Sequence, residues 1–189
     1  MQPVSPGLVT ELRRALGAEL VRTGSTELGL YRRDASNIEG VAGVVCFPET
    51  RDHVCAAVRL AVAHDTAFVA RGAGTGLAGG ATPIGGAVVI TLTKMNRVLS
   101  VDPVNRTAWV EPGVLNLDLT RAVEQHGLHF APDPSSQQSC SIGGNVANNS
   151  GGPHCLADGV TSAHVLALEV VLPDGTVAML GDEGGEAGG

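Results

Sequence analysis

The segment from residue 72 to residue 86 constrains the fold of this chain more than any other, because it is dense in glycine and lies between two apolar runs. The runs at 68–70 and 87–92 are typical of short buried strands. Glycines at this density let backbone N–H groups turn toward one point without obstruction by a Cβ atom, and such a concave surface suits an anion such as a pyrophosphate. Arg71, which precedes the segment, adds a positive charge. The pattern therefore predicts an anion-binding loop between two strands.

The glycine spacing in this segment also matches the fingerprint of a dinucleotide-binding Rossmann turn, at Gly74, Gly76 and Gly79. A Rossmann turn needs a helix that begins inside the motif and an acidic residue at the end of the next strand. The glycines and the proline at 80–86 break any helix, and the next strand follows immediately. Asp102 stands at about the right distance for the acidic residue, but it follows an extra strand and a loop. We therefore favour a pyrophosphate-binding loop over a Rossmann turn or a plain surface loop.

A second segment of small polar residues runs from 139 to 152 and follows the sequence APDP at 131–134. Hydroxyls, amides and bare backbone can surround a polar cofactor closely and donate hydrogen bonds to its carbonyls, phosphates and hydroxyls. The segment carries no well-supported acid–base group, so we expect it to bind rather than to catalyse. Taken alone, it could equally be a tight structural turn.

Helical periodicity and capping residues predict four helices. The first begins after Ser5, with proline at its first position, and stops at Gly17. Thr50 is expected to cap the second, whose apolar residues recur at intervals of three and four. Asn116 is expected to cap the third, and a short fourth helix is expected near 142–148.

Runs of apolar and β-branched residues predict the strands. These strands are expected at 44–47, 68–70, 87–92, 98–101, 107–111, 165–172 and 177–180. The first two flank the helix that begins after Thr50, so we expect a parallel strand–helix–strand unit with a right-handed crossover. The last two flank the sequence PDGT at 173–176, which predicts a hairpin turn.

The two loops belong to an ordered series of sequence segments. The whole series identifies a protein family more specifically than either loop alone. The series reads RGAGTGLAGG at 71–80, VEPGV at 110–114, APDPSSQ at 131–137, CSIGGNVANNSGG at 140–152, HCLADGVT at 154–161 and LEVVLPDG at 168–175. From about Tyr31 to Gly181, the chain thereby resembles the FAD-binding domain of the p-cresol methylhydroxylase (PCMH)/vanillyl-alcohol oxidase superfamily. Within it, the chain is similar to the FAD-binding subunit of bacterial glycolate oxidase and to D-2-hydroxy-acid dehydrogenases, including D-lactate dehydrogenases.

This resemblance implies an α+β fold of two subdomains, the PCMH-type FAD-binding fold, truncated here at its C-terminal end, with FAD extended between the subdomains. The implied pyrophosphate loop comprises Arg71, Gly72, Ala73, Gly74, Thr75 and Gly76. The implied lining of the remaining cofactor path comprises Pro132, Asp133, Ser141, Gly143, Gly144, Asn145, Gly151 and Gly159. Covalent members often carry a histidine where this chain has Thr75, so non-covalent FAD is expected. Relatives commonly carry an aromatic residue where this chain has Asp158, which puts the local wall of the site in doubt.

The activity that the resemblance implies is oxidation of a small 2-hydroxy acid, glycolate or D-lactate, by hydride transfer to FAD. The electrons would leave to a separate acceptor or to partner subunits. The alternatives are another FAD-linked oxidase of the superfamily with a different substrate, or a flavin-binding fragment without turnover. We assign no catalytic residue, because a third FAD-contacting segment and the substrate-binding cap of the family are expected after Gly189.

The resemblance divides the chain into an N-terminal helical lead-in at 1–40, an incomplete FAD-binding domain at 41–181 and a flexible, acidic, glycine-rich end at 182–189. The net charge of −7 and the aromatic content of 3% argue against nucleic acid as a partner, because phosphate backbones need a basic surface and bases need stacking platforms. No segment approaches the roughly 20 apolar residues of a transmembrane helix. We expect a cytoplasmic location, with peripheral attachment to a membrane through partner subunits as the alternative.

Two histidine motifs were candidates for other chemistry. His126 and His129 have metal-ligand spacing, but a glycine interrupts their helix and no carboxylate or cysteine stands nearby, so no metal site is expected. The four cysteines form no CxxC pair, which also argues against zinc. His154 and Cys155 are adjacent, and we expect them to pack rather than to form an activated thiolate.

Overall fold

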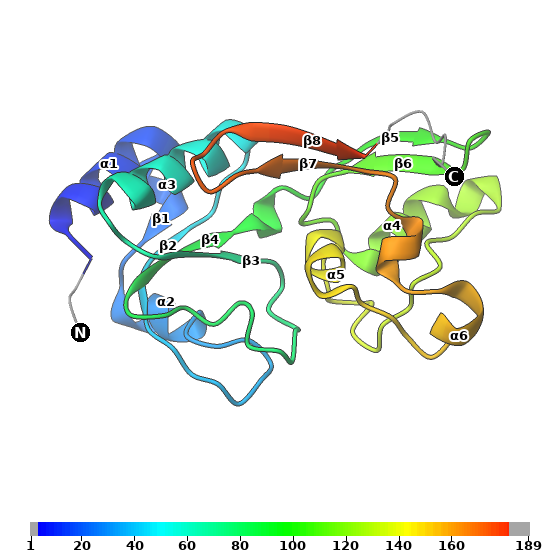
Figure 1. Ribbon diagram of the computed structural model, residues 1–189, viewed down its shortest axis with the longest axis horizontal. Helices are drawn as coiled ribbons and strands as arrows, with labels where there is room; N and C mark the ends of the chain where they lie inside the picture. The colour runs from blue at the N-terminus through cyan, green and yellow to red at the C-terminus, as the bar shows by residue number, and fades with distance from the viewer. Residues whose placement is uncertain (1–3, 182–189) are drawn as a thin grey trace.

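The computed structural model describes residues 4–181 and arranges them as two α+β lobes, with a hairpin running across from one lobe to the other (Figure 1). The first lobe contains a four-stranded sheet between helices, and the second contains a two-stranded sheet with short helices. The predicted α+β class with two subdomains is confirmed. The predicted acidic end at 182–189 lies outside the described residues.

The sheet of the first lobe has the strand order β1-β2-β4-β3. Its strands are β1 (Val21–Arg22), β2 (Ala42–Cys46), β3 (Phe68–Arg71) and β4 (Ala87–Thr91), with β1 antiparallel to β2 and the others parallel. The predicted strand–helix–strand unit is confirmed as parallel, but β4 lies between β2 and β3. All five residues of β4 are buried, as expected for a strand covered on both faces, so this apolar run takes the centre of the sheet.

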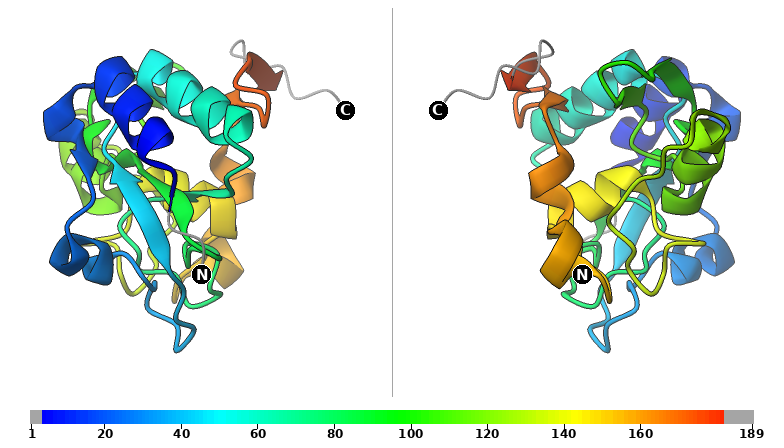
Figure 2. Two further views of the ribbon diagram at one scale, coloured as in Figure 1. Left: turned by 90° about the vertical axis from the view of Figure 1, so that its left-hand side faces the viewer. Right: turned by 90° about the vertical axis from the view of Figure 1, so that its right-hand side faces the viewer.

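Two helices cover one face of this sheet, α1 (Pro6–Leu16) and α3 (Arg51–Ala63), and they lie side by side (Figure 2). Both predicted caps are confirmed: the Ser5 hydroxyl accepts a hydrogen bond from the N–H of Leu8 at 3.1 Å, and the Thr50 hydroxyl accepts one from the N–H of His53 at 3.2 Å. Leu12 is among the buried residues of the core that the two helices form with β2 and β4. The opposite face of the sheet packs against α2 (Ser25–Leu30) and Tyr31.

The second lobe begins after β4 with a short 3-10 turn, η2 (Leu92–Lys94). Its other elements are β5 (Val98–Asp102), β6 (Thr107–Val110), α4 (Asn116–Val123), η3 (Glu124–His126), α5 (Ile142–Asn148), α6 (Cys155–Asp158) and η4 (Thr161–His164). Strands β5 and β6 are antiparallel, and α4 and α5 contribute Leu119 and Ile142 to the core of this lobe. The prediction of Asn116 as the cap of α4 is wrong. Leu115 occupies the cap position without a side-chain hydrogen bond, and the Asn116 side chain turns to another segment.

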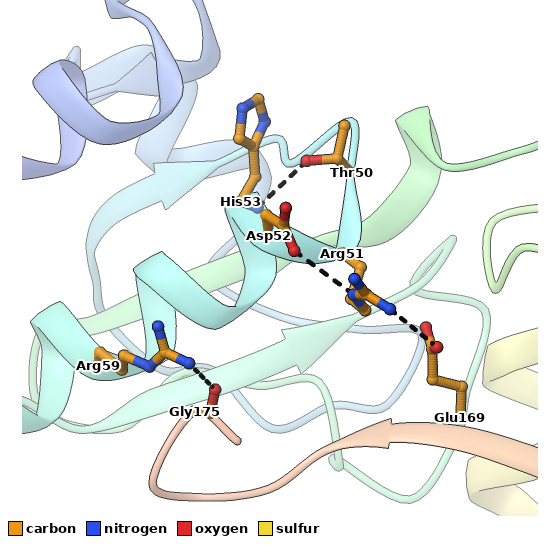
Figure 3. Close-up of polar contacts among 7 residues, drawn as sticks. All are labelled: Thr50, Arg51, Asp52, His53, Arg59, Glu169 and Gly175. Atoms are coloured by element: carbon orange, nitrogen blue, oxygen red, sulfur yellow. Dashed lines mark hydrogen bonds and ion pairs between the residues drawn. The ribbon is translucent and has the colours of Figure 1, made fainter. Parts of the chain in front are cut away.

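The hairpin of β7 (Ala167–Val171) and β8 (Val177–Gly181), predicted around its PDGT turn, fastens the end of the second lobe to α3 of the first (Figure 3). Arg51 forms an ion pair with Glu169 at 3.2 Å, and the guanidinium of Arg59 donates to the carbonyl oxygen of Gly175 at 2.7 Å. Gly175 has a φ of 77°, and a Cβ there would collide with the Arg59 side chain. The hairpin can therefore lie close to the helix only with glycine at its turn.

Among residues 4–181, no helix has the length and apolar composition needed to cross a membrane.

The core of the first lobe yields a stability prediction. We expect Leu12→Ala to lower the free energy of unfolding by about 2–5 kcal/mol, because Leu12 is fully buried between α1, α3 and the sheet and its removal leaves a cavity. The matched control is Leu156→Ala, because Leu156 is 99% exposed and its loss should change stability by less than about 0.5 kcal/mol. Urea denaturation followed by circular dichroism measures both values. Equal stabilities of the two variants would contradict this account of the core.

Candidate functional site

The glycine-rich segment between β3 and β4 contains turns and bends but no helix. The predicted loop is therefore confirmed, and the Rossmann alternative is excluded because its obligatory helix is missing from this described segment. Gly74 and Gly79 have φ values of 75° and 76°, in the left-handed region that favours glycine. The loop therefore depends on glycine for its backbone path as well as for its open surface.

The two glycine-rich segments meet at Gly72. A Cβ at Gly72 would collide with the hydroxyl of Ser141 and would lie 3.8 Å from the Cα of Gly144. Farther along the loop, a Cβ at Gly76 would lie 3.8 Å from the side-chain amide of Asn148. The first lobe thus presents its loop directly to the start and end of α5 in the second lobe. Sequence reasoning had placed Asn148 within a motif but had assigned it no position in the site.

Ser141 and Asn145 are the buried polar residues of the second segment. The Ser141 hydroxyl caps α5 by accepting a hydrogen bond from the N–H of Gly144 at 3.3 Å. Asn145 is only 1% exposed, and its Nδ2 has no hydrogen-bond partner among the described residues. A buried donor without a partner costs roughly 1–3 kcal/mol. The site therefore contains a donor that an acceptor group from outside the chain could satisfy.

Arg71, at the end of β3, anchors the loop to the segment that follows α2. Its guanidinium is mostly buried and donates to the carbonyl oxygens of Arg33 at 2.9 Å and Ala81 at 3.4 Å. It also lies 5.4 Å from the centre of the Tyr31 ring. Burial lowers the pKa of Arg71, and the nearby Tyr31 and Asp34 oppose this effect. The positive charge thus stands beside the loop, close to Gly74, and is tied to backbone carbonyls.

Asp34 accepts hydrogen bonds from the backbone of the loop at Gly79 and Ala81. The sequence analysis did not identify this residue as part of the site. Desolvation acts to raise the pKa of this buried carboxyl, but hydrogen bonds from Ser36 and from the backbone of Ala81 and Gly79 outweigh it, so the pKa is lowered. The N–H of Ala35 donates to the carbonyl oxygen of Gly76 at 3.0 Å. The hydrogen bond from Ser36 is local, but those from Gly79 and Ala81 come from a distant segment, which no local pattern could have indicated.

The segment at 131–134 lies between α4 and the stretch that leads into α6. The Asp133 carboxylate pairs with His154 at 2.5 Å, and a Cβ at Gly152 would collide with Asp133. The hydrogen bond to Asp133 raises the pKa of His154, with a further contribution from the charge of Asp133, and the same contact lowers the pKa of Asp133. The prediction that His154 and Cys155 pack together is wrong, because both are exposed and His154 reaches back to Asp133.

Ala73 and Ser141, both expected site residues, line the same cavity. This cavity of about 200 Å³ is lined by Ala73, Thr93, Asn96, Gly113, Leu115, Asp118 and Ser141, so it touches both glycine-rich segments. Gly143 packs against Pro112 so closely that a Cβ would collide with it. Gly151 lies beside Cys155, and Gly159 ends α6 with a φ of 80°. Among residues 4–181, no group of three or more histidine, cysteine or acidic side chains could hold a metal ion.

The residues present fit a cofactor with phosphates and polar ring atoms. A Cβ would collide with Ser141 at Gly72, with Arg71 at Gly74 and with Pro112 at Gly143, so these glycines let the backbone pack closely against neighbouring residues. Asn145, in the second segment, carries a buried donor without a partner among the described residues. Arg71 supplies positive charge beside the first segment. These hydroxyl, amide and backbone groups are suited to binding a polar cofactor.

Comparison with known proteins agrees with this geometry. Residues 42–181 match the family model described as FAD binding domain. The glycolate oxidase subunit GlcD of Escherichia coli (strain K12) is 46% identical over 142 residues, which cover 74% of this chain and 28% of that protein. The D-lactate dehydrogenase of Anaerostipes hadrus is 42% identical over 130 residues, which cover 69% of this chain and 27% of that protein.

The fold agrees as well. The crystal structure of p-cresol methylhydroxylase with substrate bound superimposes with a TM-score of 0.81 at 23% identity, covering 98% of this chain and 38% of that one. The chain therefore spans less than a third of the length of either curated relative named above and adopts the PCMH-type fold. Because the family model covers most of the sequence, this chain belongs to the family of FAD-binding domains found in FAD-linked oxidoreductases.

Proposed function

We propose that this chain is the FAD-binding portion of an oxidoreductase that oxidises a small 2-hydroxy acid, such as glycolate or D-lactate. The observation that carries the proposal is the contact of Gly72 with Ser141, which brings the two glycine-rich segments together. The second of these segments also contains a buried donor without a partner among the described residues, the Nδ2 of Asn145. The substrate class is supported by the relatives, which are named as a glycolate oxidase subunit and a D-lactate dehydrogenase.

In this proposal, the backbone of residues 72–76 surrounds the pyrophosphate of FAD, and Arg71 places positive charge beside it. The rest of the cofactor follows the second lobe along Pro132, Asp133, Ser141, Gly143, Gly144, Asn145, Gly151 and Gly159. Hydroxyl, amide and backbone groups of these residues can donate hydrogen bonds to a polar cofactor or accept them from it. When FAD is bound, its flavin ring supplies the two-electron redox chemistry.

The chain's own residues bind and orient the cofactor, and we assign none of them a catalytic role. In this proposal, the residues that accept the substrate proton and hold the substrate lie in parts of the whole protein that correspond to regions outside the matched 28% of the E. coli relative. A separate electron acceptor or partner subunits complete the proposed system, in keeping with the word subunit in the name of the E. coli relative. We place the FAD-binding domain at 41–181, with 1–40 as its lead-in.

The proposed location is the cytoplasm. All four cysteines are free, and burial raises the pKa of the Cys46 thiol to about 12, which keeps it protonated and unreactive. Free thiols are typical of proteins in a reducing compartment. Attachment to the membrane surface through partner subunits is the alternative.

Flavin binding tests the proposal through two glycines of the same loop. We expect Gly72→Ala to weaken FAD binding by at least about tenfold, because the new methyl group displaces the Ser141 hydroxyl and opens the contact between the segments. The matched control is Gly80→Ala, where a Cβ meets nothing within 4 Å. Titration of the purified chain with FAD, followed by flavin fluorescence, gives both dissociation constants, and circular dichroism checks the fold. Equal affinities for the two variants would refute the proposed site.

The mode of attachment gives a second test. We expect acid precipitation of the FAD-loaded chain to release all of the flavin, because Thr75 stands where covalent members of the superfamily carry histidine. The measurement is the flavin absorbance of the supernatant and of the washed pellet. Flavin that remains with the pellet would contradict non-covalent binding, and recovery of NAD in place of FAD would refute the cofactor itself.

A further inference from the structure

Asn116 is a buried polar residue to which the proposed function assigns no role. It is the first residue of α4 and only 1% exposed. Its Nδ2 donates to the carbonyl oxygen of Pro132 at 2.9 Å, and its backbone N–H donates to the carbonyl oxygen of Cys140 at 3.0 Å. One side chain and its own backbone therefore connect α4 to both parts of the second-lobe cofactor path.

The segment at 131–134 needs such an anchor because of its composition. Proline has no backbone N–H, so Pro132 and Pro134 can offer only their carbonyl oxygens to hydrogen bonds. The Asn116 amide binds the first of these oxygens from the side of α4. On the other side, Asp133 is held by His154, through the ring nitrogen and the backbone N–H. The position of Asp133 thus depends on two contacts: the bond from Asn116 to the preceding Pro132, and the bonds from His154 to Asp133 itself.

Packing alone does not account for an asparagine at this place. The Oδ1 of Asn116 has no hydrogen-bond partner among the described residues, and an unsatisfied buried acceptor destabilises the fold. A leucine of similar size would fill the space without that cost. The favourable contribution of the amide is therefore its bond to Pro132.

We infer that Asn116 is a positioning residue of the cofactor site, which holds Pro132 and Asp133 at the distance from Ser141 that bound FAD requires. The identity of the cofactor in this inference rests on the proposed function. The positions of the residues rest on the hydrogen bonds of Asn116. Asn116 acts through the 131–134 segment and the Cys140–Ser141 turn, which it connects.

The experiment reads the position of Asp133 directly, without FAD. In the wild-type chain the contact with Asp133 raises the pKa of His154, and Asp158 adds a smaller effect of the same sign. We expect Asn116→Leu to release the segment, so the pKa of His154 falls toward its ordinary value. NMR titration of the FAD-free chain measures it, with the His154 signal identified by its loss in His154→Gln. Asp133→Asn marks the value expected when the contact is fully lost.

The same variant is then titrated with FAD. We expect Asn116→Leu to weaken FAD binding by roughly tenfold and to alter the absorption spectrum of the bound flavin. Leu119→Ala is the matched control, because Leu119 is buried on the same helix in the core of this lobe and its side chain cannot form a hydrogen bond to the 131–134 segment. This control should keep the wild-type His154 pKa, flavin affinity and flavin spectrum. Asn116→Ser is a second variant for the case in which Asn116→Leu folds poorly. The serine side chain is too short to reach Pro132, so the same effects are expected.

The outcomes separate the inference from the proposed function. An unchanged His154 pKa and FAD affinity in both Asn116 variants would overturn the inference, as would equal shifts in Leu119→Ala. A lowered His154 pKa with unchanged FAD affinity and spectrum would overturn the link to the cofactor. If the wild-type chain binds no FAD while Asn116→Leu still lowers the His154 pKa, the proposed function fails and the positioning of the segment stands.

Discussion

The close approach of Gly72 to Ser141 is the contact on which the arrangement of this molecule depends. It is possible only because residue 72 has no Cβ, so the backbone after β3 can lie against the capping hydroxyl of α5. Each lobe has its own core and could be stable without the other's loop. The proposed binding surface has no such independence, because its two halves are contributed by different lobes.

The hairpin gives this contact its mechanical support. It leaves the second lobe after η4 and is held on α3 of the first lobe by Arg51 and Arg59 (Figure 3). The Arg51–Glu169 pair is exposed, so solvent and salt weaken it, whereas the Arg59 bond to Gly175 is partly buried. On the inner side of the loop, Arg71 and Asp34 bind its backbone to the segment after α2. The hairpin therefore connects the two lobes, and Arg71 and Asp34 hold the glycine-rich loop in place within the first lobe.

Local sequence signals predicted most of the elements and both loops, because caps, glycine density and apolar periodicity act over a few residues. They failed at positions whose structure depends on residues that are distant in the sequence. The central place of β4 depends on which strand is the most completely covered, and two of the partners of Asp34, Gly79 and Ala81, lie in a different segment. Asn116 shows the limit well, because asparagine at a helix start indicated a cap, in which the side-chain oxygen accepts from a backbone N–H. In the structure the Nδ2 of Asn116 instead donates to the carbonyl oxygen of Pro132, and its Oδ1 has no partner among the described residues.

The contact at Gly72 also has a consequence for how the chain is made. Residues 72 and 141 are roughly seventy positions apart, so closing them together costs loop entropy that neither lobe alone repays. During synthesis the first lobe can form its sheet as soon as β4 has emerged, but its glycine loop then has nothing to rest against. The ability to hold a cofactor is therefore acquired in one late step, when α5 and the hairpin arrive and the two halves of the surface first coexist.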